Sequence, residues 1–186
     1  ALFNNKVSVL VGDFLLATSL VQVGLTRDCD IIDVVAHLGQ NLADGEILQL
    51  SNVSNKEFSE DVYYSVIYKK TAALFAACAK VAALSAGASK ESVIEATKFG
   101  EYLGICFQIK DDIFDYSDSS SIGKPTGNDM LEGKLTLPAL YVLNKTNSEE
   151  IKELAFRIKG GEASLHEIHK FIGYVIDHGG IEYAES

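Results

Sequence analysis

The sequence has little proline, cysteine and basic charge, and it contains no tryptophan. Because there are only 2 prolines in 186 residues, few positions would interrupt a long helix. The alternation of polar and apolar residues that is typical of strands is also nearly absent. The cysteines, Cys29, Cys78 and Cys106, are odd in number and lack the C-x-x-C spacing of zinc or redox sites. These absences argue against a disulfide-rich secreted domain and favour an all-α protein in a reducing cytoplasm.

Basic residues are outnumbered by acidic ones. The 16 Lys and Arg residues against 26 Asp and Glu residues give a formal net charge of −10 at pH 7. Nucleic acid is therefore not expected as a partner, because binding of its phosphate backbone requires a basic surface. A phosphate-containing ligand would have to be held locally, by a metal ion or by a few well-placed lysines.

Neither a transmembrane segment nor a signal peptide is expected. The longest apolar stretch, residues 71–88, carries Lys80 and is rich in alanine, which favours a buried core helix over a membrane span. The first residues lack a basic region followed by an apolar block and a small-residue cleavage site. The sequence opens at the approach to a helix and stops at Ser186 within a helical pattern, so we expect a fold truncated at both ends.

Helical spacing of apolar residues is abundant. The chain is 47% hydrophobic, which is enough for a sizeable core in a single domain over residues 1–186. Ser54 and Ser89 are the expected N-caps of two helices, and Asp13, alone in an apolar run, is expected to be buried and hydrogen-bonded. The recurrence of apolar residues every three or four positions predicts helices over residues 5–23, 30–50, 56–84, 90–116, 134–144, 149–159 and 164–178.

Four polar residues share one face of the helix predicted over residues 90–116. Gln108, Asp111, Asp112 and Asp115 are spaced i, i+3, i+4 and i+7, which places them in one stripe. Like charges at this spacing destabilise an isolated helix by about 0.2–0.5 kcal/mol per pair, so a cation should compensate them. Ligands that offer only oxygen favour Mg²⁺, or Mn²⁺, over zinc. The alternative for this stripe is a solvated acidic helix end.

A glycine-containing loop with two lysines follows the aspartate stripe. Lys124 and Lys134 bracket Asp129 there. Lysine ammonium groups suit diphosphate oxygens as mobile point charges, and glycines allow a loop to fold over a ligand. Alone, this segment would be an ordinary loop, but its position directly after the stripe makes it a candidate binding segment.

Together these motifs resemble those of the trans-isoprenyl (polyprenyl) diphosphate synthases. Residues 107–115 read Phe-Gln-x-x-Asp-Asp-x-x-Asp, residues 123–129 read Gly-Lys-Pro-x-Gly-x-Asp, and residues 132–138 read Glu-Gly-Lys-x-Thr-Leu-Pro. This order is similar to the second aspartate-rich motif of the family and the loop that follows it. Further landmarks in the family's order are Gly12-Asp13, Gly45-Glu46, Lys70-Thr71 and Gly179-Gly180.

The resemblance implies the isoprenoid synthase fold, a bundle of antiparallel helices around a central cavity, usually as a homodimer. In that family two aspartate-rich motifs face each other and bind the Mg²⁺ ions that grip an allylic diphosphate. By resemblance, Asp111, Asp112 and Asp115 ligate metal. The implied diphosphate-binding residues are Lys70, Thr71, Gln108, Lys124 and Lys134. Lys70, Asp111 and Lys124 are the implied catalytic residues.

The first aspartate-rich motif of the family, and the basic residues that bind isopentenyl diphosphate, would precede Ala1. This sequence contains neither. Metal ligation from one side only is expected to be weak, so the resemblance describes the parent enzyme and predicts little turnover by this chain alone.

The implied activity is a Mg-dependent prenyl transfer that condenses isopentenyl diphosphate with an allylic diphosphate. Ionisation of the allylic diphosphate builds negative charge on the leaving group, which Mg²⁺ and lysines stabilise, and no protein nucleophile is needed. Residues 132–138 favour a medium- or long-chain polyprenyl synthase over a farnesyl synthase. The alternatives left open are a non-catalytic regulatory subunit of a heteromeric prenyl synthase, a terpene cyclase and a purely structural helical domain.

Overall fold

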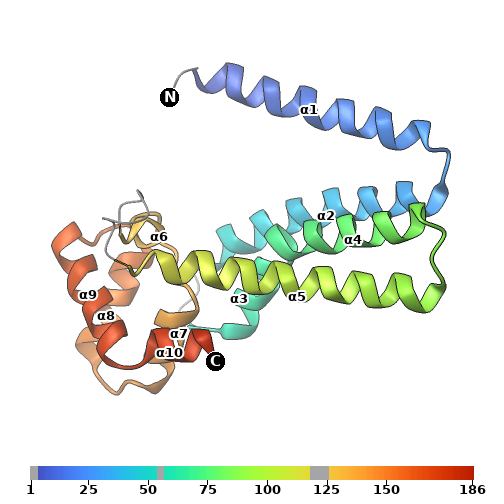
Figure 1. Ribbon diagram of the computed structural model, residues 1–186. Coiled ribbons are helices and arrows are strands. Elements are labelled where there is room, and N and C mark those ends of the chain that lie inside the picture. The colour runs from blue at the N-terminus through green and yellow to red at the C-terminus, as the bar shows by residue number, and fades with distance from the viewer. Residues whose placement is uncertain (1–3, 54–56, 118–125) are drawn as a thin grey trace.

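The regular elements of the chain are all helices in the residues that the computed structural model describes, which are 4–53, 57–117 and 126–186 (Figure 1). The all-α prediction is therefore confirmed for these residues. In chain order the elements are α1 (Asn5–Leu25), α2 (Cys29–Val53), α3 (Glu60–Ile67), the π-helix η1 (Tyr68–Ala72), α4 (Ala73–Ser85), α5 (Lys90–Phe114), α6 (Asn128–Leu131), α7 (Leu137–Lys145), α8 (Glu149–Lys159), α9 (Leu165–Asp177) and α10 (Gly180–Glu185).

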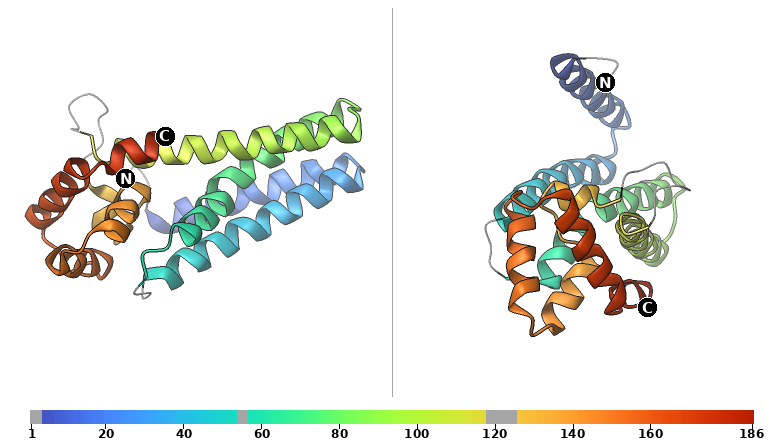
Figure 2. Two further views of the ribbon diagram at one scale, coloured as in Figure 1. Left: turned by 90° about the horizontal axis from the view of Figure 1, so that it is seen from below. Right: turned by 90° about the vertical axis from the view of Figure 1, so that its left-hand side faces the viewer.

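Three long helices, α2, α4 and α5, run antiparallel to their neighbours along the length of the molecule (Figures 1 and 2). The approach of α4 and η1 to α5 depends on glycine. A Cβ atom at Gly104 would lie 2.5 Å from the Cα of Ala72, and one at Gly100 would lie 2.6 Å from the carbonyl oxygen of Phe75. No side chain fits at either position, so the backbones of these helices are in direct contact.

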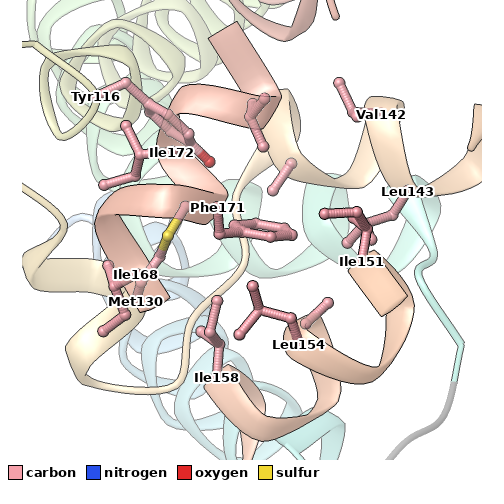
Figure 3. Packing of buried hydrophobic residues seen from close by; sticks show 13 residues of the cluster. Tyr116, Met130, Val142, Leu143, Ile151, Leu154, Ile158, Ile168, Phe171 and Ile172 are labelled. Carbon is pink, nitrogen blue, oxygen red and sulfur yellow. The ribbon is translucent and has the colours of Figure 1, made fainter. Parts of the chain in front are cut away.

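Helices α6 to α10 form a second group around the larger hydrophobic core (Figure 3). Phe171 of α9 lies at its centre and is fully buried, as is Ile158 of α8, and Met130 of α6 belongs to the same cluster. Tyr116, just after α5, belongs to the same cluster. This core anchors the C-terminal end of α5, which is where the predicted aspartate stripe lies.

The helix predicted over residues 56–84 differs from the structure. It is divided into α3, η1 and α4, and its first residue is Glu60. Ser59 is the N-cap and accepts a hydrogen bond from the N–H of Val62 at 3.3 Å, whereas Ser54, the cap that the sequence favoured, lies outside the described residues. Ser89 is confirmed as the N-cap of α5, since its Oγ accepts from the N–H of Ser92 at 3.2 Å.

Helix α1 stands apart from the other helices (Figure 1). None of its residues is buried, so the prediction of a buried Asp13 is wrong for this chain. Its length and its apolar composition would both allow it to cross a membrane. The buried core helices of other proteins and signal sequences share these two properties. The expected absence of a transmembrane segment therefore stays a prediction.

Replacement of Gly104 by alanine tests the close contact between α5 and η1. We expect Gly104→Ala to lower the free energy of unfolding by about 1–3 kcal/mol, because the new methyl group meets the backbone of Ala72. Gly39→Ala in α2 is the matched control, since a Cβ there meets nothing within 4 Å. The control should stabilise the helix by about 0.5–1 kcal/mol. Urea denaturation of both variants measures the difference, and equal stability of the two would contradict the expectation.

Candidate active site

A cavity of about 180 Å³ lies between α2, α3, η1, α5 and the segment from α6 to α7. It brings together five of the residues that the sequence singled out, from three separate parts of the chain: Lys70, Thr71, Gln108, Asp112 and Lys134. Of the remaining predicted site residues, Asp111 and Asp115 are half-buried and lie outside the lining of this cavity, and Lys124 lies outside the described residues.

The π-helix η1 presents two neighbouring side chains to two different helices. Lys70 faces α2, where its ammonium group pairs with Glu46 at 2.7 Å and donates a hydrogen bond to the side chain of Gln49. Thr71 faces α5 and donates to Oε1 of Gln108 at 2.7 Å. A π-helix closes i to i+5 bonds and is often found at functional sites. The sequence, interpreted as one continuous helix, did not reveal it.

Asp112 is the centre of a buried hydrogen-bond network. Its side chain is only 3% exposed. Oδ1 accepts from Nε2 of Gln108 at 2.8 Å, and Oδ2 accepts from the hydroxyl group of Tyr63 at 2.6 Å. Together with the bond from Thr71 to Gln108, these contacts connect α3, η1 and α5 through side chains alone.

Burial dominates the electrostatics of this network. It raises the pKa of the Asp112 carboxyl to about 7, although the hydrogen bonds from Tyr63 and Gln108 act in the opposite direction. Burial also raises the pKa of the Tyr63 phenol, and the neighbouring Asp112 charge adds to this effect. Near neutral pH, therefore, the carboxyl takes up a proton readily and the phenol remains a donor.

Asp115 organises the chain that follows the aspartate stripe. Its Oδ1 accepts from the N–H of Asn128 at 2.9 Å and its Oδ2 from the N–H of Asp129 at 3.1 Å, so the carboxylate caps the first turn of α6. Gly127 makes the preceding turn with a φ of 79°, where a residue with a side chain would be strained. The predicted metal ligation by Asp115 stays a prediction, beside this structural role.

The capped turn returns the chain to the cavity. The backbone N–H of Lys134 donates to the carbonyl oxygen of Asp129 at 2.8 Å, and the Lys134 ammonium donates to Glu132 at 2.5 Å. Burial, followed by the nearby charge of Asp115, raises the pKa of Asp129. The sequence placed Asp129 between two lysines but assigned it no role.

Two further cavity residues had no signal in the sequence. Tyr63 is one of several tyrosines in an ordinary helical pattern, and only its contact with Asp112, 49 residues away, distinguishes it. Lys159 ends α8, is 7% exposed, and lies with its ammonium 5.9 Å from the ring centre of Phe58. Burial lowers the pKa of Lys159. Both residues reach the cavity through long-range packing.

The donor chemistry of the site fits Mg²⁺ shared with a diphosphate. Within the described parts of the chain, no group of three or more His, Cys, Asp or Glu side chains is placed to hold a metal ion. Mg²⁺ is usually bound by one or two carboxylates, several waters and substrate phosphates. The oxygen donors of the stripe are of the kind that Mg²⁺ takes, and the predicted metal ligation by Asp111, Asp112 and Asp115 stays a prediction.

The raised pKa of Asp112 predicts a pH dependence of stability. The folded value of about 7 exceeds the ordinary 3.8, so the folded chain binds this proton more tightly than the unfolded chain. The resulting stabilisation is complete below the ordinary pKa and is lost as pH rises through about 7. We expect the free energy of unfolding to fall between about pH 4 and about pH 7, and to fall less in Asp112→Asn. Urea denaturation with a chelator present measures this, and identical slopes would contradict it.

The Polyprenyl synthetase family matches residues 1–175 of this chain. Octaprenyl diphosphate synthase from Haemophilus influenzae is 36% identical over 183 residues, which cover 98% of this chain and 55% of that protein. The chain thus spans about half the length of this curated relative.

Solved structures show the same relationship. Geranylgeranyl pyrophosphate synthase from Bacteroides thetaiotaomicron superposes with a TM-score of 0.92 at 63% identity, over 98% of this chain and 61% of that one. A polyprenyl synthase from Caulobacter crescentus, solved with calcium and isoprenyl diphosphate, gives 0.87 at 32% identity, over 96% of this chain and 55% of that one. The predicted isoprenoid synthase fold is confirmed by these superpositions. With a family match over nearly the whole chain, a shared fold and the aspartate and lysine motifs around one cavity, the chain belongs to the polyprenyl synthetase family.

Proposed function

We propose that this chain forms the diphosphate-ionising part of a trans-prenyltransferase, which joins isopentenyl diphosphate to an allylic diphosphate. The observation that carries the proposal is the cavity in which Lys70, Thr71, Gln108 and Lys134 converge beside Asp112. Cationic and amide donors around a carboxylate-flanked cavity suit a diphosphate better than a neutral ligand. The names of the relatives, octaprenyl diphosphate synthase and geranylgeranyl pyrophosphate synthase, support the same chemistry.

The reaction needs charge stabilisation more than a nucleophile. The allylic carbon–oxygen bond breaks heterolytically, and its electron pair leaves with the diphosphate. Lys70 and Lys134 would bind the oxygens on which this charge grows. The double bond of isopentenyl diphosphate then attacks the allylic cation, and loss of a proton restores a double bond. Mg²⁺, held by Asp111 with other carboxylates of the stripe, would neutralise diphosphate charge when bound.

Lys70 is prepared for this role by its partners on α2. An ammonium group has three N–H donors. Glu46 and Gln49 each accept from Lys70, which holds the long side chain at the cavity wall. A remaining N–H can therefore meet a diphosphate oxygen without the cost of ordering a free lysine side chain, which would otherwise reach about 2 kcal/mol.

Homodimer formation is a second part of the proposal, and α1 supports it. The exposed large apolar side chains of α1 include Leu10 at 66% and Phe14 at 69% exposure. Large exposed apolar surfaces mark contacts with another protein surface or with a membrane. We propose that a second copy covers α1.

Ligand binding with Asp111→Ala tests the diphosphate site. We expect calorimetry to show that inorganic pyrophosphate binds the chain more tightly with Mg²⁺ than without it, and that Asp111→Ala lowers this gain by about tenfold or more. Asp177→Ala, at the exposed end of α9, is the matched control and should bind as the wild type does. Failure of the wild type to bind pyrophosphate under any condition would overturn the proposed site.

Turnover is tested with farnesyl diphosphate and labelled isopentenyl diphosphate. Products that require Mg²⁺ and disappear in Asp111→Ala would support the transferase and give its chain length directly. Mg-dependent pyrophosphate binding without products would support the diphosphate site and leave the transfer step to residues outside residues 1–186. Release of cyclised hydrocarbon from farnesyl diphosphate alone would favour a terpene cyclase.

Dimer formation is tested by light scattering after gel filtration. The double variant Leu10→Glu/Phe14→Glu should shift a wild-type dimer toward monomer, because two charges would be buried at the contact. Leu165→Glu is the matched control, because Leu165 is also an exposed apolar residue but lies on α9 instead of α1. This control variant should remain dimeric. A wild-type chain that is monomeric at all concentrations would contradict the proposal.

A further inference from the structure

We propose that Tyr63 is a positioning residue for the diphosphate site: its hydroxyl group fixes Asp112, and Asp112 fixes the side-chain amide of Gln108. The proposal rests on the proposed function, because it concerns how the same cavity meets a diphosphate. Tyr63 itself need not touch the ligand. Its effect is transmitted through two hydrogen bonds.

The position of the Tyr63 hydroxyl is determined by packing. The ring is 7% exposed and belongs to a small core with Ile67, Leu137 and Leu140. Tyr64 lies edge-on to it, with ring centres 5.5 Å apart and planes at 71°. A ring packed on these sides has little freedom to turn. Its hydroxyl group, which donates the 2.6 Å hydrogen bond to Oδ2 of Asp112, is therefore held in one position.

The fixed carboxylate sets the orientation of the Gln108 amide. The amide nitrogen is directed to Oδ1 of Asp112, which turns the amide oxygen toward Thr71. Thr71 donates its single hydroxyl proton to that oxygen, so it offers the cavity only lone pairs. The second N–H of Gln108 is then the donor that this pair can supply to a diphosphate.

Loss of the tyrosine hydroxyl would release this orientation. Without it, Oδ2 of Asp112 would be buried and lack its donor, which favours rotation of the carboxyl group. This rotation would displace Oδ1, the acceptor that holds the Gln108 nitrogen. A turned amide would then direct its oxygen at the anionic ligand, which repels it.

The test compares Tyr63→Phe with Tyr64→Phe in calorimetric binding of inorganic pyrophosphate with Mg²⁺. Each variant removes one phenol oxygen from adjacent residues of α3, and only the first breaks the bond to Asp112. We expect Tyr63→Phe to weaken binding by about tenfold, the size of one lost hydrogen bond to a charged group, and Tyr64→Phe to bind as the wild type does. Thermal unfolding without ligand reports whether each variant is folded.

A double-mutant cycle separates positioning from general destabilisation. In a Gln108→Ala background, Tyr63→Phe should cause no further loss, because the amide that it positions is gone. In a Lys70→Ala background the tenfold loss should persist, since Lys70 contacts α2 instead of this network. A loss of equal size in both backgrounds would overturn the proposal, as would equal binding by Tyr63→Phe and Tyr64→Phe.

The outcomes also distinguish this proposal from the proposed function. If the wild type does not bind pyrophosphate, the proposed diphosphate site is wrong. If the wild type binds it with Mg²⁺ and Tyr63→Phe binds equally well, only the positioning role of Tyr63 is wrong. If Tyr63→Phe does not fold, Asp112→Asn provides the second test, in pyrophosphate binding without metal. Its loss of affinity must likewise vanish in the Gln108→Ala background, and persistence there would contradict the proposal.

Discussion

Direct backbone contact between α5 and the helix formed by η1 and α4 is the constraint on which the site depends. Gly100 and Gly104 leave no room for a side chain at this contact. Because the backbones meet there, Thr71 and Gln108 come within 2.7 Å of each other although they are 37 residues apart in the chain. A wider separation of these helices would break the hydrogen bond from Thr71 to Gln108.

The π-helix solves a geometric problem at this contact. Lys70 and Thr71 are neighbours in sequence, yet one must face α2 and the other α5. Gly45 of α2 makes the approach of Lys70 possible, since a Cβ there would lie 2.8 Å from the Cγ of Lys70. Glycine on α2 and glycine on α5 thus accommodate the two sides of the same widened turn.

The sequence predicted the parts of the site that depend on local spacing. The stripe from Gln108 to Asp115 follows from helical periodicity, and α5 with its Ser89 cap is where the pattern placed it. The π-helix was missed because the apolar residues before and after it were interpreted as one continuous helical pattern. Tyr63 was missed because its role exists only through a partner on another helix.

Boundaries were the other source of error. The helix predicted from residue 56 begins at Glu60, where Ser59 provides a cap that equals Ser54 as a sequence signal. Asp13 was expected to be buried because it interrupts an apolar run, but that run forms a helix with no buried residue. Hydrophobicity indicates which surface avoids water and does not identify the surface that covers it.

The three acidic positions of the stripe all carry aspartate, but they differ in whether a longer acidic side chain would be accepted. Asp115 caps α6 through two backbone N–H groups, and short side chains serve in caps because one more methylene moves the carboxylate past these donors. Asp112 is enclosed, so a longer acid there would strain its packing. Asp111 is partly exposed and lies outside the lining of the cavity. The regular spacing of the motif therefore conceals three positions with different surroundings, and a longer acidic side chain is least acceptable at the two whose oxygens are held by hydrogen bonds within the chain.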